Sequence, residues 1–277
     1  MASVQQLLRA AVDLPGEEAR REAEILLGHC LGKSRAWLYT WPEADVAPDQ
    51  AGSYRAMLAR RKEGIPVAYL TGEREFWSLR LAVDEHTLIP RAETETLVEW
   101  ALALPLPDNA HVADLGTGSG AIALAVASER ENWRVTATDS SASALEVAAG
   151  NARRNKLDQV EFMHSDWYAA LRGRRFDLLL SNPPYIAAND EHLRQGDLRF
   201  EPRQALVADR GGLAALAVLV EGAPRHLQGD GWLLLEHGWE QGAAVRELLR
   251  DRGFCRIATR CDTTGLERIT GGCWHAE

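Results

Sequence analysis

Apolar residues in the first 75 positions recur at spacings of three and four, the period of an α-helix with one buried face. Four such segments are separated by Gly or Pro, residues at which helices commonly end. The pattern therefore predicts a small helical domain over residues 1–75. Its expected helices are Val4–Ala11, Glu17–Cys30, Ser34–Thr40 and Gln50–Glu63.

The pattern changes at residues 75–83, where the stretch EFWSLRLAV alternates in the way that is typical of a β-hairpin. We expect residues 76–92 to form this hairpin and a linker. A helix from about Thr94 to Leu104 follows.

Residues 93–277 alternate between strand and helix patterns. Because repeated strand–helix units form parallel sheets covered on both faces, the sequence predicts an α/β fold with a doubly wound, mostly parallel sheet. The last two strands have too little chain between them for a crossover helix, so we expect them to be antiparallel. The expected strands are 111–116, 133–139, 160–166, 176–182, 230–238, 254–260 and 266–272, and the expected helices are Ser119–Glu129, Ala142–Asn155, Leu213–Leu227 and Gln241–Arg252.

The composition is typical of a globular protein and argues against a membrane span and a broad nucleic-acid-binding surface. No apolar run approaches the ~20 residues of a membrane span, and the charged N-terminal pattern is unlike a signal peptide. The net charge is −9, and residues 1–75 hold ten basic and eleven acidic residues, so no basic recognition face is expected. We therefore expect neither a membrane nor a direct nucleic-acid partner.

The four cysteines indicate a reducing environment. They are sparse and form no CxxC pair, which is typical of cytoplasmic proteins. Cys255, Cys261, Cys273 and His275 match no common zinc spacing, so no metal site is predicted.

A glycine-rich loop follows the first strand of the predicted sheet. Glycines allow the tight turn and the close approach of the backbone to a ligand that nucleotide-binding loops require. We expect the loop to bind a nucleotide cofactor through Gly116, Thr117, Gly118, Ser119 and Gly120.

The loop alone does not separate NAD from S-adenosylmethionine as the cofactor. Asp114 favours the latter, because a carboxylate before the first glycine would repel a pyrophosphate but suits a cationic amino-acid group. Asp139 ends the next strand, where an acid can accept hydrogen bonds from two ribose hydroxyls; its alternative is a helix N-cap. Trp167, after Asp166, is a candidate to flank the adenine ring, although a Trp there can equally belong to the core.

A second motif, Asn182-Pro183-Pro184-Tyr185, ends the strand FDLLLS. Proline fixes φ and contributes no N–H, so the turn presents a rigid pair of acceptors: the Asn182 side-chain oxygen and the Pro183 carbonyl. Two such acceptors can hold both N–H bonds of a planar NH₂ group, with Tyr185 packed against it.

This geometry suits methyl transfer to a conjugated nitrogen. Attack on a sulfonium methyl moves positive charge towards the nitrogen, and acceptors on its N–H bonds strengthen as that charge grows. Asn182, Pro183 and Tyr185 are therefore the candidate catalytic residues, and the whole turn is the candidate substrate site. No strong base is required before transfer, so Glu236-His237 is interpreted as supporting structure rather than an acid/base pair.

The motifs DLGTGSG, TDSSASAL and SNPPY resemble those of class I S-adenosylmethionine-dependent methyltransferases that modify amino nitrogens. The flanking segments TGEREFWSL, TLIPRAETE, GDLRFEPRQAL and LLLEHGWEQG narrow the resemblance to the bacterial N5-glutamine methyltransferases of peptide chain release factors. The resemblance covers nearly the whole chain.

The resemblance implies methylation of the glutamine side-chain amide in the Gly-Gly-Gln motif of release factors. Residues 116–120, Asp139, Trp167 and Asn182 would contact S-adenosylmethionine, and residues 182–185 would hold the glutamine. The helical domain would help to grip the release factor, and we expect a monomer. Arg91 and Glu93 fall in a segment expected near the active site, in which Ala92 stands where the family usually has Pro.

The sequence leaves four other functions open. They are methylation of a ribosomal-protein glutamine, methylation of an adenine amino group in nucleic acid, cofactor binding without catalysis, and NAD-dependent oxidation. Methylation of adenine in nucleic acid would require a basic region that binds phosphates, and residues 1–75 have none. Asp114 argues against NAD as the cofactor, because its carboxylate would repel a pyrophosphate.

Overall fold

The computed structural model describes residues 2–10, 14 and 18–275. The chain forms two compact units. One contains Met1–Glu73 together with His192–Phe200, and the other contains Arg74–Glu191 and Glu201–Glu277. Each unit is described separately below.

The helical unit buries one apolar face of each of its main helices. Leu26, Leu27 and Tyr54 lie at its centre and are fully buried. The hydroxyls of Ser3 and Ser34 accept hydrogen bonds from the first turns of the helices that follow them. The elements are β1 (Ala2–Ser3), α1 (Val4–Arg9), α2 (Ala19–Leu31), α3 (Arg35–Thr40), β2 (Asp45–Val46), α4 (Pro48–Lys62) and α5 (Val67–Thr71), with β1 antiparallel to β2.

The four predicted N-terminal helices are present. The expected ends at Ala11 and Glu17 lie outside the described residues. The short helix α5 and the β1–β2 pair were not predicted, because two- and five-residue elements carry too few positions for a periodic pattern.

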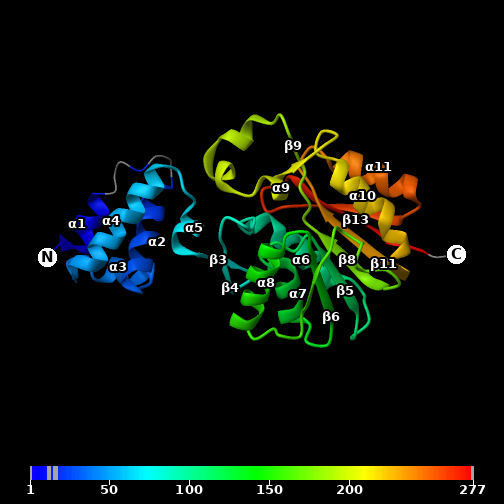
Figure 1. The fold of residues 1–277 in the computed structure, drawn as a ribbon, viewed down its shortest axis with the longest axis horizontal. Coiled ribbons are helices and arrows are strands. Elements are labelled where there is room, and N and C mark those ends of the chain that lie inside the picture. The colour runs from blue at the N-terminus through cyan, green and yellow to red at the C-terminus, as the bar shows by residue number, and fades with distance from the viewer. Residues whose placement is uncertain (1, 11–13, 15–17, 276–277) are drawn as a thin grey trace. The chain divides into compact units, whose positions relative to one another are not determined.

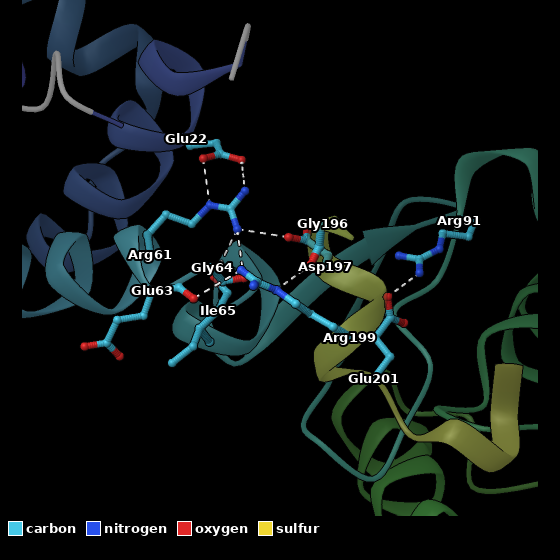
Figure 2. Close-up of polar contacts among 10 residues, drawn as sticks. All are labelled: Glu22, Arg61, Glu63, Gly64, Ile65, Arg91, Gly196, Asp197, Arg199 and Glu201. Atoms are coloured by element: carbon cyan, nitrogen blue, oxygen red, sulfur yellow. Dashed lines mark hydrogen bonds and ion pairs between the residues drawn. The ribbon is translucent and has the colours of Figure 1, made fainter. Parts of the chain in front are cut away.

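The segment His192–Phe200 belongs to the helical unit although it comes more than a hundred residues later in the chain. Arg61 at the end of α4 binds both carboxylate oxygens of Glu22, at 2.7 and 2.8 Å, and donates to Asp197 at 2.9 Å. Arg199 donates to the carbonyl of Glu63 at 3.2 Å. Figure 2 shows these contacts converging on Arg61 and on the turn after α4. The segment contains the 3₁₀ turn η3 (Gly196–Phe200), and η2 (Glu191–Arg194) leads into it.

The second unit is built on a seven-stranded sheet with the order β12-β13-β11-β8-β5-β6-β7. Strands β11, β8, β5, β6 and β7 are parallel, whereas β13 is antiparallel to both β11 and β12. This confirms the predicted doubly wound sheet with an antiparallel terminal pair. The strands are β5 (His111–Leu115), β6 (Arg134–Asp139), β7 (Glu161–His164), β8 (Phe176–Ser181), β11 (Leu227–Glu236), β12 (Cys255–Cys261) and β13 (Glu267–Trp274).

Helices cover both faces of this sheet, as Figure 1 shows. Successive side chains of a strand point to opposite faces, so Leu178 and Leu180 pack into one apolar cluster and Leu179 into the other. The first cluster is closed by α6 (Glu95–Ala103), α7 (Ala121–Glu129) and α8 (Ala142–Arg154). The second is closed by α10 (Ala214–Gly222) and α11 (Gly242–Arg252).

One predicted helix was too long. The pattern predicted a helix over Leu213–Leu227, but α10 ends at Gly222 and is followed by the 3₁₀ turn η4 (Ala223–Arg225), which contains Pro224. Leu227 already belongs to β11, because a proline cannot continue the hydrogen bonding of a helix and the chain turns into the sheet.

The remaining elements are short. The predicted hairpin is β3 (Glu73–Phe76) with β4 (Leu79–Ala82), and η1 (Ala92–Thr94) precedes α6. Two-residue strands β9 (Ile186–Ala187) and β10 (Val207–Ala208) pair in parallel, with α9 (Arg203–Leu206) before β10. Among the described residues, no helix has the length and apolar character needed to cross a membrane.

We predict that Arg61→Ala frees the segment 192–200 from the helical unit, because five hydrogen bonds of the guanidinium are lost and Glu22 keeps an unpaired charge. Backbone amides of residues 192–200 should exchange with solvent at least about tenfold faster, and the melting temperature should fall by roughly 3 °C. Hydrogen-exchange mass spectrometry measures the first effect. Arg60→Ala is the control, because Arg60 is the exposed neighbour of Arg61. Unchanged amide exchange in the Arg61 variant would contradict the role of Arg61 in holding residues 192–200.

Candidate active site

A cleft lies in the second unit at the carboxyl ends of β5, β6 and β8, the edge at which open α/β sheets bind ligands. Its volume is about 860 Å³, including its open mouth. The glycine-rich loop and the Asn-Pro-Pro-Tyr turn both contribute to it. The lining residues are His86, Leu88, Pro90, Arg91, Thr94, Gly116, Thr117, Gly118, Ser119, Ala121, Ile122, Asp139, Ser140, Ser141, Ala144, Trp167, Asn182, Pro184, Gln204 and Ala205.

The glycine-rich loop is held by the neighbouring strand. The backbone N–H groups of Gly116 and Thr117 both donate to the carbonyl of Thr138 at 2.9 Å. The Thr117 hydroxyl donates to Asp114 at 2.6 Å, and the N–H of Gly118 donates to Asp139 at 2.9 Å. Gly118 has φ +56°, a left-handed conformation that favours glycine. The loop is therefore fixed before any ligand binds.

Gly120, the last expected cofactor contact, does not line the cleft. It precedes α7 with φ +86°, and a Cβ at this position would lie 3.2 Å from the Cβ of Ala148. This glycine allows α7 to pack against α8. Its contact with a cofactor stays a prediction.

Asn151 braces the loop from behind and was missed by the sequence analysis. It is fully buried on α8, and its amide donates to the carbonyls of Ser119 at 2.9 Å and Ala82 at 3.0 Å. Its side-chain oxygen accepts from the Ala82 N–H at 2.6 Å. The signal in the sequence was a lone Asn on the otherwise apolar face of α8.

Asp139 lies at the end of β6, and its carboxylate can accept further hydrogen bonds. One of its oxygens accepts from Gly118 and the other from the N–H of Ser141 at 2.8 Å. The N-cap of α8 is Ser141, so Asp139 does not have the capping role that was its alternative. Each carboxylate oxygen has two lone-pair directions, so one position on each stays available to a ligand. Trp167, with φ +46°, also lines the cleft, and a Cβ on Gly116 would lie 3.4 Å from its ring.

Asp114 is fully buried and does not line the cleft. Its Oδ2 accepts from Thr117 and from the N–H of Ala123, whereas Oδ1 has no hydrogen-bond partner among the described residues. Burial raises the pKa of Asp114 to about 7. Its observed role is to brace the loop, and its expected attraction for a cationic cofactor group stays a prediction.

The Asn-Pro-Pro-Tyr turn is fixed against the glycine-rich loop by Ser181, whose hydroxyl donates to the carbonyl of Leu115 at 2.5 Å. Asn182 and Pro184 line the cleft, whereas Pro183 is buried. The amide nitrogen of Asn182 donates to the hydroxyl of Thr94 at 3.2 Å. The Asn182 oxygen is therefore the end of this side chain that is available to a ligand.

Tyr185 lies outside the cleft lining. Its ring packs against the second apolar cluster, and its hydroxyl donates to Glu236 at 3.3 Å. His237 is also engaged within the protein, with one ring nitrogen 2.8 Å from the Gly238 carbonyl and the other 2.7 Å from the Thr270 hydroxyl.

Arg91 also lines the cleft and forms an ion pair with the buried carboxylate of Glu201. Figure 2 shows this pair. Glu201 also accepts from the backbone N–H of Ile89 at 3.0 Å, so one buried acid holds the wall at residues 89–91. In the described part of the chain, no cluster of His, Cys, Asp or Glu could hold a metal ion.

The fold and the cleft define a class I methyltransferase. Residues 94–217 match the family described as Methyltransferase small domain. A solved methyltransferase from Pyrococcus furiosus has the same fold, with a TM-score of 0.56 over 80% of this chain and 98% of that one at 17% identity.

Relatives that match more than nine tenths of the chain identify the particular family. Residues 2–72 match the PrmC N-terminal domain. Release factor glutamine methyltransferase of Pseudomonas aeruginosa is 51% identical over 99% of both chains. That of Xylella fastidiosa is 55% identical over 91% of this chain and 92% of the relative. The chain belongs to the release factor glutamine methyltransferase family.

We predict that Asp114 contributes to the free energy of unfolding of the ligand-free protein a stabilisation that is lost as the pH rises from about 4 to about 7. The native pKa of Asp114, about 7, lies above its ordinary value of 3.8, so between these values the native state keeps a proton that the unfolded state has lost. Asp114→Asn should reduce the slope of this free energy against pH. Urea unfolding at several pH values measures it, and an equal slope in the variant and the parent protein would contradict the prediction.

Proposed function

We propose that the protein transfers a methyl group from S-adenosylmethionine to the side-chain amide nitrogen of the glutamine in the Gly-Gly-Gln motif of peptide chain release factors. The observation that carries the proposal is the position of Asn182 in the same cleft as the glycine-rich loop and Asp139. The names of the relatives at 51% and 55% identity support this substrate.

The residues of the cleft fit this cofactor. Asp139 keeps two acceptor positions, which match the two hydroxyls of a ribose. Trp167 supplies an aromatic plane for an adenine ring, and residues 116–119 line the same cleft. S-adenosylmethionine supplies, when bound, an electrophilic methyl group on a sulfonium.

The turn at residues 182–185 would hold the glutamine. The Asn182 oxygen and the Pro183 carbonyl accept the two N–H bonds of the amide and turn its nitrogen towards the methyl group. These bonds strengthen as positive charge develops on the nitrogen, which stabilises the transition state. Tyr185 supports the turn from behind. Proximity and alignment supply the remaining acceleration, so no strong base is needed before transfer.

The helical unit is the part of the chain that we assign to release-factor recognition. The net charge of −9 favours a protein over a nucleic acid as the partner. We further propose that the enzyme acts as a monomer in the cytoplasm.

The proposal is tested with methyl-deuterated S-adenosylmethionine and three separate substrates: unmethylated release factor, ribosomal proteins and duplex DNA. Peptide mapping by mass spectrometry locates the label. We expect one labelled methyl group on the glutamine of the Gly-Gly-Gln peptide. Label confined to a ribosomal protein or to DNA would refute the release-factor assignment.

Two substitutions separate the roles of the acceptor and the ribose-binding acid. Asn182→Ala should lower kcat by roughly 100-fold or more while cofactor affinity changes little. Asp139→Ala should weaken cofactor binding by about tenfold or more, since it removes two charge-assisted acceptors. Calorimetry and steady-state kinetics distinguish the two effects. Full turnover in the Asn182 variant would rule out the two-acceptor mechanism.

A further inference from the structure

The side-chain amide of Gln241 joins three backbone segments of the second unit. Gln241 is the residue before α11, and its Oε1 accepts from the N–H of Gly238 at 2.9 Å. Its Nε2 donates to the carbonyl of Tyr185 at 3.0 Å and to that of Gly211 at 3.3 Å. The amide oxygen therefore has a donor and both N–H bonds have acceptors, which fixes the orientation of the amide.

The loop that carries Gln241 is closed on itself. The backbone N–H of Gln241 donates to the carbonyl of Gly238 at 2.8 Å, so the backbone and the side chain of one residue both bond the other. The carbonyl of Gln241 accepts from the N–H of Val245 at 3.0 Å, in the first turn of α11. The donor to Tyr185 thus comes from a short, hydrogen-bonded loop between β11 and α11.

The Asn-Pro-Pro-Tyr turn has few groups of its own by which it can be held, because its two prolines have no N–H. Its first end is fixed by Ser181, whose hydroxyl donates to the carbonyl of Leu115 at 2.5 Å. Its last end is fixed by Gln241, which donates to the carbonyl of Tyr185. The acceptor carbonyl of Pro183 lies in the chain between these two anchors.

Gly212 is shaped around the same hydrogen bond. It is buried and has φ +88°, a conformation that favours glycine. A Cβ at this position would collide with the carbonyl oxygen of Tyr185 and would lie 2.7 Å from Nε2 of Gln241. The absence of a side chain at Gly212 therefore allows the carbonyl and the amide to meet.

We propose that Gln241 is a positioning residue, which holds the carbonyl of Tyr185 and thereby fixes the acceptor pair of Asn182 and Pro183 in the orientation that a substrate NH₂ requires. Gln241 does not line the cleft, so it acts through the turn and not on the substrate. The effect on turnover rests on the proposed function. The anchoring of the turn does not depend on the identity of the substrate.

Two substitutions of Gln241 test the proposal. Gln241→Met keeps an unbranched side chain of similar length and removes the three hydrogen bonds of the amide. Gln241→Glu keeps an acceptor for Gly238 but turns a second carboxylate oxygen towards two carbonyls. Gln228→Glu is the matched control, because it makes the same change at an exposed residue of β11.

Gln241→Met should lower kcat by roughly tenfold, because the acceptors are no longer held in register with the methyl donor. Gln241→Glu should lower kcat further, since it sets acceptor against acceptor. The KM for S-adenosylmethionine should stay within about twofold in both variants, because the cofactor contacts are unchanged. Gln228→Glu should retain the kcat of the parent protein. Melting temperature and the stoichiometry of cofactor binding give the folded fraction of each variant.

Gly212→Ala disturbs the same hydrogen bond from the other side. Its methyl group should displace the carbonyl of Tyr185 and lower kcat by roughly tenfold with Gln241 intact. Gly173→Ala is the control for backbone strain, because Gly173 has φ +76° and a Cβ there would have no atom within 4 Å. The control should keep the kcat of the parent protein.

A second readout does not depend on turnover. Tyr185-Ile186 is the only Tyr-Ile pair in the sequence, so protein made with ¹³C-carbonyl tyrosine and ¹⁵N-isoleucine gives a single carbonyl–amide correlation. The ¹³C frequency of this carbonyl should move in Gln241→Met and Gln241→Glu, because the carbonyl loses its donor, but not in Gln228→Glu.

An unmoved Tyr185 carbonyl signal in both Gln241 variants, or full turnover in both, would overturn the proposal. If the signal moves but the parent protein leaves Gly-Gly-Gln glutamine unmethylated, the anchoring of the turn by Gln241 stands and the proposed function fails.

Discussion

The parallel pairing of β5 with β8 is the constraint on which the site depends. Asp114 pairs with Leu180, so the two strands end side by side, and the hydroxyl of Ser181 joins the ends by donating to the carbonyl of Leu115. One strand continues into the glycine-rich loop and the other into Asn182 and its two prolines. The glycine-rich loop and the Asn-Pro-Pro-Tyr turn thus meet at one cleft. Since a misplacement of about 1 Å can cost a hundredfold in rate, this fixed geometry is itself a large part of the proposed catalysis.

Buried polar side chains maintain that geometry around the cleft. Asn151 holds the back of the glycine-rich loop, Thr94 holds the amide of Asn182, and Glu201 holds the wall that carries Arg91. Each is a buried polar group that is costly to leave unpaired, so each fixes its neighbours in one arrangement. Glu236 and Asp114 differ, because each keeps one carboxylate oxygen without a partner among the described residues. Protonation of these two buried carboxylates therefore changes the free energy of the native state.

The sequence predicts the sheet and most of the helices because their signal is local and periodic. Leu178, Leu179 and Leu180 alternate between two cores, and the glycine-rich loop stands at a strand–helix junction. The hydrogen bonds and ion pairs between polar side chains leave no local, periodic pattern in the sequence. The bond from Asn182 to Thr94 spans 88 residues, and the bond from Arg61 to Asp197 spans 136. For the same reason the helical domain was predicted as one continuous stretch, and no local pattern places residues 192–200 with it.

The most direct test of this account is a crystal structure of the protein with S-adenosylhomocysteine and a release factor that carries the Gly-Gly-Gln motif. The quantity to measure is the distance from the glutamine amide nitrogen to the Asn182 side-chain oxygen and to the Pro183 carbonyl. The account predicts that both distances are about 3 Å, with the nitrogen facing the cofactor sulfur. An amide nitrogen that contacts neither acceptor, or an Asn182 side chain with its nitrogen towards the substrate, would contradict it.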